Sequence, residues 1–145
     1  RPVIIRNPMS TRPWQHVLEP LSGYLTLAER LYLEGDLYTG AWNFGPEDQD
    51  VTSVGDVADI LVELWGDAVW EQDTSAHPHE ARLLKLDISK AKANLNWHPK
   101  WGLKDSLDNI VIWHKNWLRG GCAKELCLQE IVKFTEKLGA NNEPS

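Results

Sequence analysis

Apolar residues recur along this chain at two spacings, and the spacing changes several times from that of a strand to that of a helix. Residues 3–5 form a short, β-branched apolar run, which predicts a strand. After a loop with two prolines, apolar residues fall at helical spacing up to Gly35. Because proline is tolerated only in the first helical turn, Pro20 places the start of this helix near residues 16–19. The apolar positions on its predicted face are Val17, Leu18, Leu21, Tyr24, Leu25, Ala28, Leu31 and Tyr32.

The same two spacings alternate through the middle of the chain. Residues 39–45 predict a short strand that runs into a loop at Gly45-Pro46. Ser53, followed three residues later by Asp56, is a helix start, and Gly66 closes that helix. Residues 69–71 predict a further strand, and the polar stretch 72–82 predicts a loop.

The C-terminal part of the chain is mainly helical in its pattern. A strand is predicted at residues 83–86, and Asp87 is placed to cap a short helix that ends near Leu95. A long amphipathic helix then runs to Gly120-Gly121, and a last one covers residues 123–138. Strands that alternate with helices indicate the α/β class with a mostly parallel sheet.

Only three or four strands are visible, so the predicted sheet is incomplete. Buried parallel strands need cover on both faces. We therefore expect this chain to leave sheet edge and apolar surface exposed, and to be oligomeric, swapped or of low stability by itself.

Composition narrows the possible partners. The chain has 145 residues, 42% of them hydrophobic and 25% charged, with a net charge of −6. This suits one soluble domain, and an acidic balance argues against nucleic-acid or membrane-surface binding. No apolar run approaches the roughly 20 residues that span a bilayer. The two cysteines stand five residues apart on a predicted helix, which disfavours a disulfide and indicates a reduced, cytoplasmic protein.

Several catalytic and cofactor signatures are absent from the sequence. It contains no glycine-rich dinucleotide motif, no P-loop, no nucleophile elbow and no H-E-x-x-H. None of the three tyrosines is followed four positions later by lysine, so the Tyr-x-x-x-Lys pair of short-chain dehydrogenases is missing. We therefore expect no catalytic, cofactor-binding or metal-binding residue in this chain.

Three residues are candidates for binding a phosphorylated sugar. Arg12 precedes Pro13, which favours an extended backbone, and its guanidinium could clamp a pyrophosphate. On spacing alone, stacking on Trp14 or pairing with a surface carboxylate is favoured over the clamp. His16 stands at a predicted helix start, where capping is favoured over ligand contact. Asn43 lies at the end of a predicted strand, where an amide could contact a phosphate and a hydroxyl or simply form a turn.

The loop at residues 76–82 adds further polar candidates. Arg82 could be a second anion contact and Glu80 could accept from sugar or ribose hydroxyls, although a solvated loop explains both residues as well. His77 and His79 suggest a metal, but Pro78 and the lack of further ligands argue against one. Eight tryptophans are unusual for this length, and we assign six of them to packing. These six are Trp65, Trp70, Trp97, Trp101, Trp113 and Trp117.

Several strings in this sequence closely resemble the CDP-glucose 4,6-dehydratases of the extended short-chain dehydrogenase/reductase superfamily. The strings are Arg6-Asn7-Pro8, Thr11-Arg12-Pro13-Trp14-Gln15-His16-Val17-Leu18-Glu19-Pro20-Leu21-Ser22-Gly23-Tyr24-Leu25, Trp42-Asn43-Phe44-Gly45-Pro46, His77-Pro78-His79-Glu80-Ala81, Leu84-Lys85-Leu86-Asp87 and Ser89-Lys90-Ala91. Leu95 to Trp101 is similar to a Leu-Gly-Trp-x-Pro element, with Asn96 where glycine is usual. The resemblance covers about residues 3–119, and none is evident after Gly121.

The resemblance implies that this is the C-terminal, substrate-binding part of such an enzyme. The family converts CDP-glucose to CDP-4-keto-6-deoxyglucose for deoxysugars of surface polysaccharides, with a bound NAD that takes a hydride from the sugar and returns it. The NAD-binding fold and the Tyr-Lys pair belong to the N-terminal half, which this chain lacks. The resemblance maps substrate contacts onto Arg12, Asn43 and Arg82.

These observations support one hypothesis and leave two alternatives. We expect an α/β nucleotide-sugar lobe at residues 1–121, with an incomplete Rossmann sheet, followed by a C-terminal helix and tail at residues 122–145. The expected ligand is CDP-glucose or a related nucleotide sugar, bound by Arg12, His16, Asn43, Glu80 and Arg82, in a homo-oligomer inactive without its other half. The rivals are a part of another nucleotide-sugar epimerase or decarboxylase, and a non-catalytic interaction module.

Overall fold

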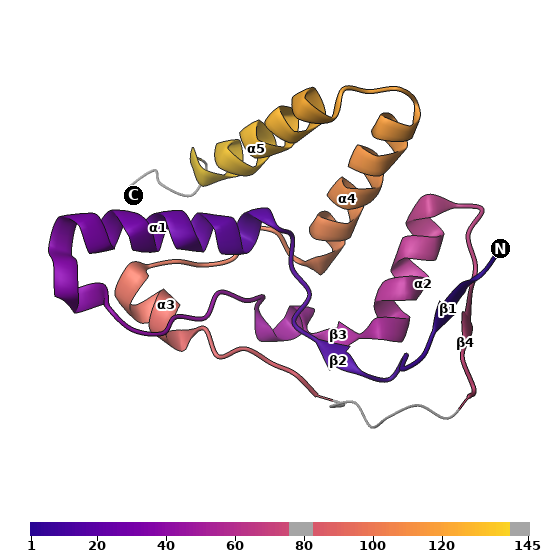
Figure 1. Ribbon diagram of the computed structural model, residues 1–145, viewed down its shortest axis with the longest axis horizontal. Coiled ribbons are helices and arrows are strands. Elements are labelled where there is room, and N and C mark those ends of the chain that lie inside the picture. The colour runs from indigo at the N-terminus through magenta and orange to yellow at the C-terminus, as the bar shows by residue number, and fades with distance from the viewer. Residues whose placement is uncertain (76–82, 140–145) are drawn as a thin grey trace.

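The computed structural model describes residues 1–75 and 83–139, which form helices and two small two-stranded sheets (Figure 1). In chain order the elements are β1 Val3–Ile5, β2 Thr11–Arg12, α1 Leu18–Glu34, the 3-10 helix η1 Gly35–Tyr38, the 3-10 helix η2 Asp48–Asp50, β3 Thr52–Ser53, α2 Val54–Trp65, β4 Trp70–Gln72, α3 Ser89–Leu95, α4 Leu103–Leu118 and α5 Ala123–Gly139. The five α-helices of the described residues agree with those predicted from the sequence.

The two sheets differ in direction. β1 pairs in parallel with β4, with Val3 opposite Trp70 and Ile5 opposite Gln72. This small parallel sheet, with α2 beside it in Figure 1, is consistent with the predicted α/β class. β2 pairs antiparallel with β3, which the sequence did not predict because two-residue strands are too short to show periodicity.

Two predicted strands are wrong. Residues 39–45 form no strand, and residues 83–86 contribute only a single bridge from Leu83 to Thr11. In the first segment, side chains take the place of a neighbouring strand. Gln15 donates to the carbonyl of Phe44 at 2.9 Å, and Lys90 donates to the carbonyl of Ala41 at 2.9 Å. The side-chain bonds satisfy polar backbone groups that a sheet would otherwise pair.

The helix ends follow the local sequence. Ser53 and Asp56 form a capping box at the start of α2, as predicted. The predicted cap is wrong by one residue, because Ile88 is the N-cap of α3; Asp87 precedes it and accepts from the backbone N–H of Ser89 at 2.9 Å, which supports the start of the helix. Asn96 ends α3 with a φ of 51°, a left-handed conformation that asparagine tolerates better than most residues. This explains how asparagine can stand where the resembling element has glycine.

The hydrophobic core lies between α1 and α3. Its buried residues are Phe44, Ile88, Ala91, Leu95 and Trp97. The Phe44 ring meets Trp97 edge-on at 5.0 Å between centroids. It also lies over Gly23 of α1, where an added Cβ would stand only 2.2 Å from the ring. The absence of a side chain at that position therefore lets α1 approach the core.

Helix α1 turns most of its predicted apolar face away from this core, although Tyr24 meets the Phe44 ring edge-on at 5.5 Å between centroids. The inward-facing positions include Glu19 and Gly23, which are both buried. On the predicted apolar face, Leu25 is 73% exposed and Tyr32 is 89% exposed. The periodicity thus located the apolar stripe correctly, but the described residues leave most of it uncovered.

A second apolar surface lies over the parallel sheet. An open cavity of about 460 Å³ is bordered by β1, β4, α2 and α4, and its lining includes Ile5, Trp14, Leu61 and Val111. This agrees with the expectation that the sheet leaves apolar surface uncovered, while the oligomeric state stays a prediction.

The assignment of tryptophans to packing is partly correct. Trp97 and Trp101 are buried, whereas Trp65 and Trp117 are 37% and 49% exposed. Trp117 instead stacks on Trp113, with ring centroids 6.1 Å apart. On α5, Phe134 is buried. The two cysteines are free and exposed, as their spacing predicts.

Candidate functional site

The loop that carries Arg12 is fixed by backbone hydrogen bonds to the start of α2. The N–H groups of Val54 and Gly55 donate to the carbonyls of Ser10 and Pro8, at 2.9 and 2.8 Å. An added Cβ on Gly55 would lie 3.3 Å from atoms of Pro8, so the close approach needs a small residue there. The loop is therefore a firm support for the side chains that follow it.

Arg12 is half-buried at the end of β2, next to Pro13, and its backbone is extended as predicted. Its guanidinium donates from Nη1 to the carbonyl of Thr11 at 2.9 Å. Trp14 points its indole N–H to the carbonyl of Thr52 at 3.2 Å. The Trp14 side chain thus ties the loop to β3.

Gln15 joins this loop to the segment that carries Asn43. Its Nε2 donates to the carbonyl of Phe44 at 2.9 Å, while its Oε1 is buried and accepts no hydrogen bond from the described residues. Sequence reasoning did not single out Gln15 beyond its place between two candidates. Its hydrogen bond nevertheless holds two predicted site segments together.

Asn43 itself is exposed, and its Nδ2 donates to the carbonyl of Asp87 at 3.2 Å. Hydrogen bonds from Ser89 lower the pKa of the Asp87 carboxyl below its ordinary value. One cation stands close to this segment, because Lys90 lies 4.1 Å from the centroid of the Trp42 ring. The Asn43 segment therefore combines an amide, a carboxylate and an ammonium group at the surface.

His16 is buried, with 2% of its surface exposed. Its Nδ1 accepts from the backbone N–H of Leu18 at 3.3 Å, which is the helix-capping role that the sequence favoured. Its Nε2 lies 3.4 Å from a carboxylate oxygen of Glu130 on α5. Burial lowers the pKa of His16 below its ordinary value, which favours the neutral ring.

Glu19 is a structural residue that sequence reasoning missed. It is fully buried in the first turn of α1, and its carboxylate accepts from the backbone N–H groups of Lys100 and Trp101, at 3.0 and 2.8 Å. A glutamate amid apolar residues near a helix start was the available signal, because a buried carboxylate needs several donors. Glu19 fixes the helix that follows Arg12 to the turn at residues 97–102.

The remaining candidates, Glu80 and Arg82, lie outside the described residues, as do His77 and His79. The described part of the chain contains no group of three or more acidic, histidine or cysteine residues that could hold a metal ion. In the same residues, no helix is long and apolar enough to cross a membrane.

Comparison with known proteins confirms the resemblance noted in the sequence. The chain is 60% identical over 119 residues to a CDP-glucose 4,6-dehydratase of Salmonella typhimurium, covering 81% of this chain and 33% of that protein. It is 30% identical over 107 residues to UDP-glucuronic acid decarboxylase 1 of Arabidopsis thaliana, covering 73% of this chain and 22% of the relative. No family model matches the chain.

A third relative matches over a shorter stretch. It is a UDP-glucuronate 4-epimerase of Thermodesulfobacterium geofontis, 32% identical over 63 residues, which cover 43% of this chain and 20% of that protein. The chain thus spans about a third of the length of its dehydratase relative, and less of the other two.

Proposed function

We propose that this chain, which is homologous to part of a CDP-glucose 4,6-dehydratase, binds the CDP-sugar substrate of such an enzyme. The observation that carries the proposal is the junction between the loop of Arg12 and the segment of Asn43, held by the Gln15 hydrogen bond to Phe44. A cation and an amide on two joined segments suit a pyrophosphate and its neighbouring hydroxyls. The 60% identity to a CDP-glucose enzyme supports cytidine as the nucleoside.

Each binding residue has a defined task in this proposal. The Arg12 guanidinium would form a charge-assisted contact with the pyrophosphate, and its bond to Thr11 orients it. Asn43 would donate to a phosphate or accept from a hydroxyl. His16 would not touch the ligand, because it is buried at the start of α1. It would instead hold the loop in place.

The residues of this chain do not fit NAD. The sequence has no glycine-rich dinucleotide loop and no Tyr-x-x-x-Lys pair, so it offers no means to cradle a pyrophosphate-linked dinucleotide or to move a proton beside the nicotinamide. We place NAD binding, and with it hydride transfer and loss of water, on the part of the relative's length that has no counterpart here. By itself this chain would bind substrate without turning it over.

A titration with CDP, followed by tryptophan fluorescence, tests the proposal, with UDP and dTDP as controls. Trp14 lies two residues from Arg12, so ligand at the loop should alter its emission. We expect CDP to bind most tightly. Arg12→Ala should weaken binding by about 1.5 to 3 kcal/mol, the scale of a hydrogen bond to a charged group. Arg119→Ala, which removes an exposed arginine at the end of α4, should leave the affinity unchanged.

The outcomes separate the proposal from its rivals. Tighter binding of UDP than of CDP would favour an epimerase or decarboxylase, the classes of the two weaker relatives. If no nucleotide binds, the chain is joined to the remaining two thirds of the dehydratase and the titration repeated. If the joined protein also binds no nucleotide, the proposal is contradicted and a non-catalytic interaction module is favoured.

A further inference from the structure

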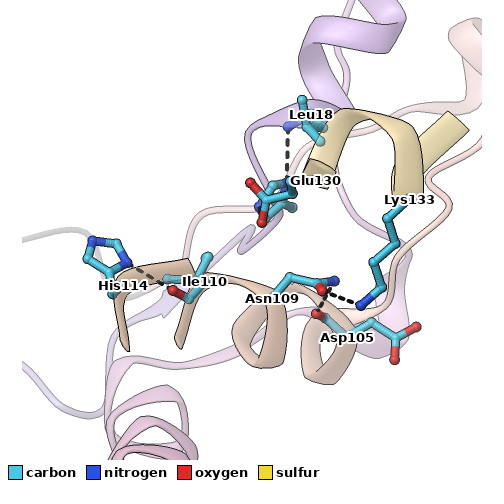
Figure 2. Close-up of polar contacts among 8 residues, drawn as sticks. Leu18, Asp105, Asn109, Ile110, His114, Glu130 and Lys133 are labelled. Atoms are coloured by element: carbon cyan, nitrogen blue, oxygen red, sulfur yellow. Dashed lines mark hydrogen bonds and ion pairs between the residues drawn. The ribbon is translucent and has the colours of Figure 1, made fainter. Parts of the chain in front are cut away.

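Helix α5, the last helix of the chain, makes a polar contact with His16, at the end of the loop that carries Arg12. The family resemblance noted in the sequence ends before this helix. Figure 2 shows Glu130 of α5 near the first turn of α1, where Leu18 is labelled. The carboxylate oxygen Oε1 of Glu130 lies 3.4 Å from Nε2 of His16, and the His16 side chain is 3% exposed and that of Glu130 17% exposed. Helix α5 therefore covers the histidine that caps α1.

One hydrogen bond of His16 defines its tautomer. Nδ1 accepts from the N–H of Leu18 at 3.3 Å, so in the neutral ring the proton is on Nε2. That nitrogen faces Glu130, which is an acceptor. Both neighbours thus favour the same tautomer, and a ring rotated by half a turn would put the carbons Cδ2 and Cε1 in place of Nδ1 and Nε2, so the Leu18 N–H would lose its acceptor. Glu130 and Leu18 together hold the imidazole in one orientation.

Ring contacts also pack α5 against His16 and its neighbours. The Phe134 ring meets Trp101 edge-on, with centroids 5.0 Å apart, and Trp101 meets His16 at 4.9 Å. Lys100 lies with its ammonium group 4.4 Å from the centroid of Phe134. Phe134 and Glu130 stand four residues apart on α5, so one face of this helix contacts both the ring beside His16 and His16 itself.

We propose that Glu130 is a positioning residue of the substrate site, which acts through His16 to hold the loop from Arg12 to His16 in its binding conformation. This rests on the proposed function for the meaning of that loop. Helix α5 is then part of the binding machinery and not an appendage. Loss of the carboxylate frees the His16 ring on one side, and the loop that ends at His16 loses one of its attachments.

Charged groups from several elements surround the contact between His16 and Glu130. Burial raises the pKa of Glu130, while Lys133 on α5 and His114 on α4 oppose that rise. Lys133 is also tied to α4, because its ammonium group donates to Oδ1 of Asn109 at 2.6 Å (Figure 2). The buried Glu19 of α1 also faces this region. Lys100, in the turn at residues 97–102, faces it as well, and burial lowers the pKa of its ammonium group.

The test compares two changes at Glu130 with the same changes at Glu136, an exposed glutamate on α5. Glu130→Leu removes the acceptor, and Glu130→Gln keeps an acceptor but removes the charge. The readouts on the full chain are amide hydrogen exchange at Leu18, the pKa of His16 by NMR, and the indole N–H signal of Trp14, which reports the loop. Circular dichroism confirms that each variant is folded.

We expect Glu130→Leu to speed exchange at Leu18 about tenfold, the scale of one lost buried hydrogen bond, and to shift the Trp14 signal. Glu130→Gln should restore both, yet lower the His16 pKa, because an anion beside Nε2 is gone. CDP affinity should fall in Glu130→Leu and return in Glu130→Gln. The Glu136 variants should match the wild type in every readout.

Two failures have different signatures. The positioning role is overturned if Glu130→Leu leaves Leu18 exchange, the His16 pKa and the Trp14 signal equal to those of the Glu136 variants. It is also overturned if Glu130→Leu changes the His16 pKa but neither the Trp14 signal nor CDP affinity. If these readouts move as expected but no nucleotide binds to the wild-type chain or to its fusion with the rest of the dehydratase, the coupling stands and the proposed function fails.

Discussion

Replacing Glu19 by alanine should be among the most damaging single changes to the stability of this chain. The side chain is 0% exposed, and its Oε1 accepts from the backbone N–H groups of Lys100 and Trp101 at 3.0 and 2.8 Å. Alanine offers no acceptor, so both donors would lose their partner. Trp101 is itself buried, so water cannot readily replace the carboxylate at that N–H.

The size of the effect follows from these contacts. A hydrogen bond to a charged group contributes about 1.5 to 3 kcal/mol, and two are lost. The gain from no longer burying a carboxylate offsets part of this, because desolvation of an ion costs several kcal/mol. We expect Glu19→Ala to lower the free energy of unfolding by about 2 to 4 kcal/mol, a large share of the roughly 5 to 15 kcal/mol of a typical domain.

Urea unfolding followed by tryptophan fluorescence measures this change, since Trp101 lies beside the lost contact. Glu19→Gln should cost less than alanine, because the amide keeps one oxygen that can accept. The matched control is Glu29→Ala, an exposed glutamate on the same helix, which should change stability by no more than about 0.5 kcal/mol. A Glu19→Ala variant as stable as this control would refute the assignment of Glu19 as the anchor of the turn at residues 97–102.

Three further predictions follow from the packing and the charges. Gly23→Ala should destabilise the chain by about 1 to 3 kcal/mol in the same urea assay, because the new Cβ would stand 2.2 Å from the Phe44 ring; unchanged stability would mean that α1 can shift freely. The His16 pKa lies below 6.5 in the folded state, so the unfolded state binds more protons between the two values. Stability should therefore fall as the pH drops through that window, and less so in His16→Gln; equal slopes would show that the imidazole titrates as in solvent. The exposed stripe of α1 and the cavity over β1 and β4 should make the isolated chain associate or swap, visible by light scattering, whereas a cooperatively melting monomer would contradict this.

Local signals explain why the sequence predicted the helices well. Ser53 with Asp56, and the glycines that follow α1 and α2, act within a few residues of the chain. Such caps and stops do not depend on the rest of the fold. The strands were harder, because a two-residue strand such as β2 has no period, and the segment at residues 39–45 has its backbone bonded by side chains from elsewhere.

The candidate site was predictable only in part. The sequence placed Arg12 on an extended backbone and His16 at a helix start, and both placements hold. It could not pair Gln15 with Phe44, 29 positions away, or bring Glu130 to His16 across more than a hundred residues. Contacts of that kind arise from packing of whole elements, and no local spacing encodes them.

Helix α1 illustrates the division most clearly. The sequence by itself determined this helix and its apolar stripe: apolar spacing indicated the helix, because a period of 3.6 residues follows from backbone geometry, and Pro20 and Gly35 indicated its ends. Tertiary structure alone decided that the stripe with Leu25 faces outward while Glu19 and Gly23 face the core. The physical reason is that two specific contacts, Glu19 with the turn at residues 97–102 and Gly23 with Phe44, fix the rotation of the helix about its axis.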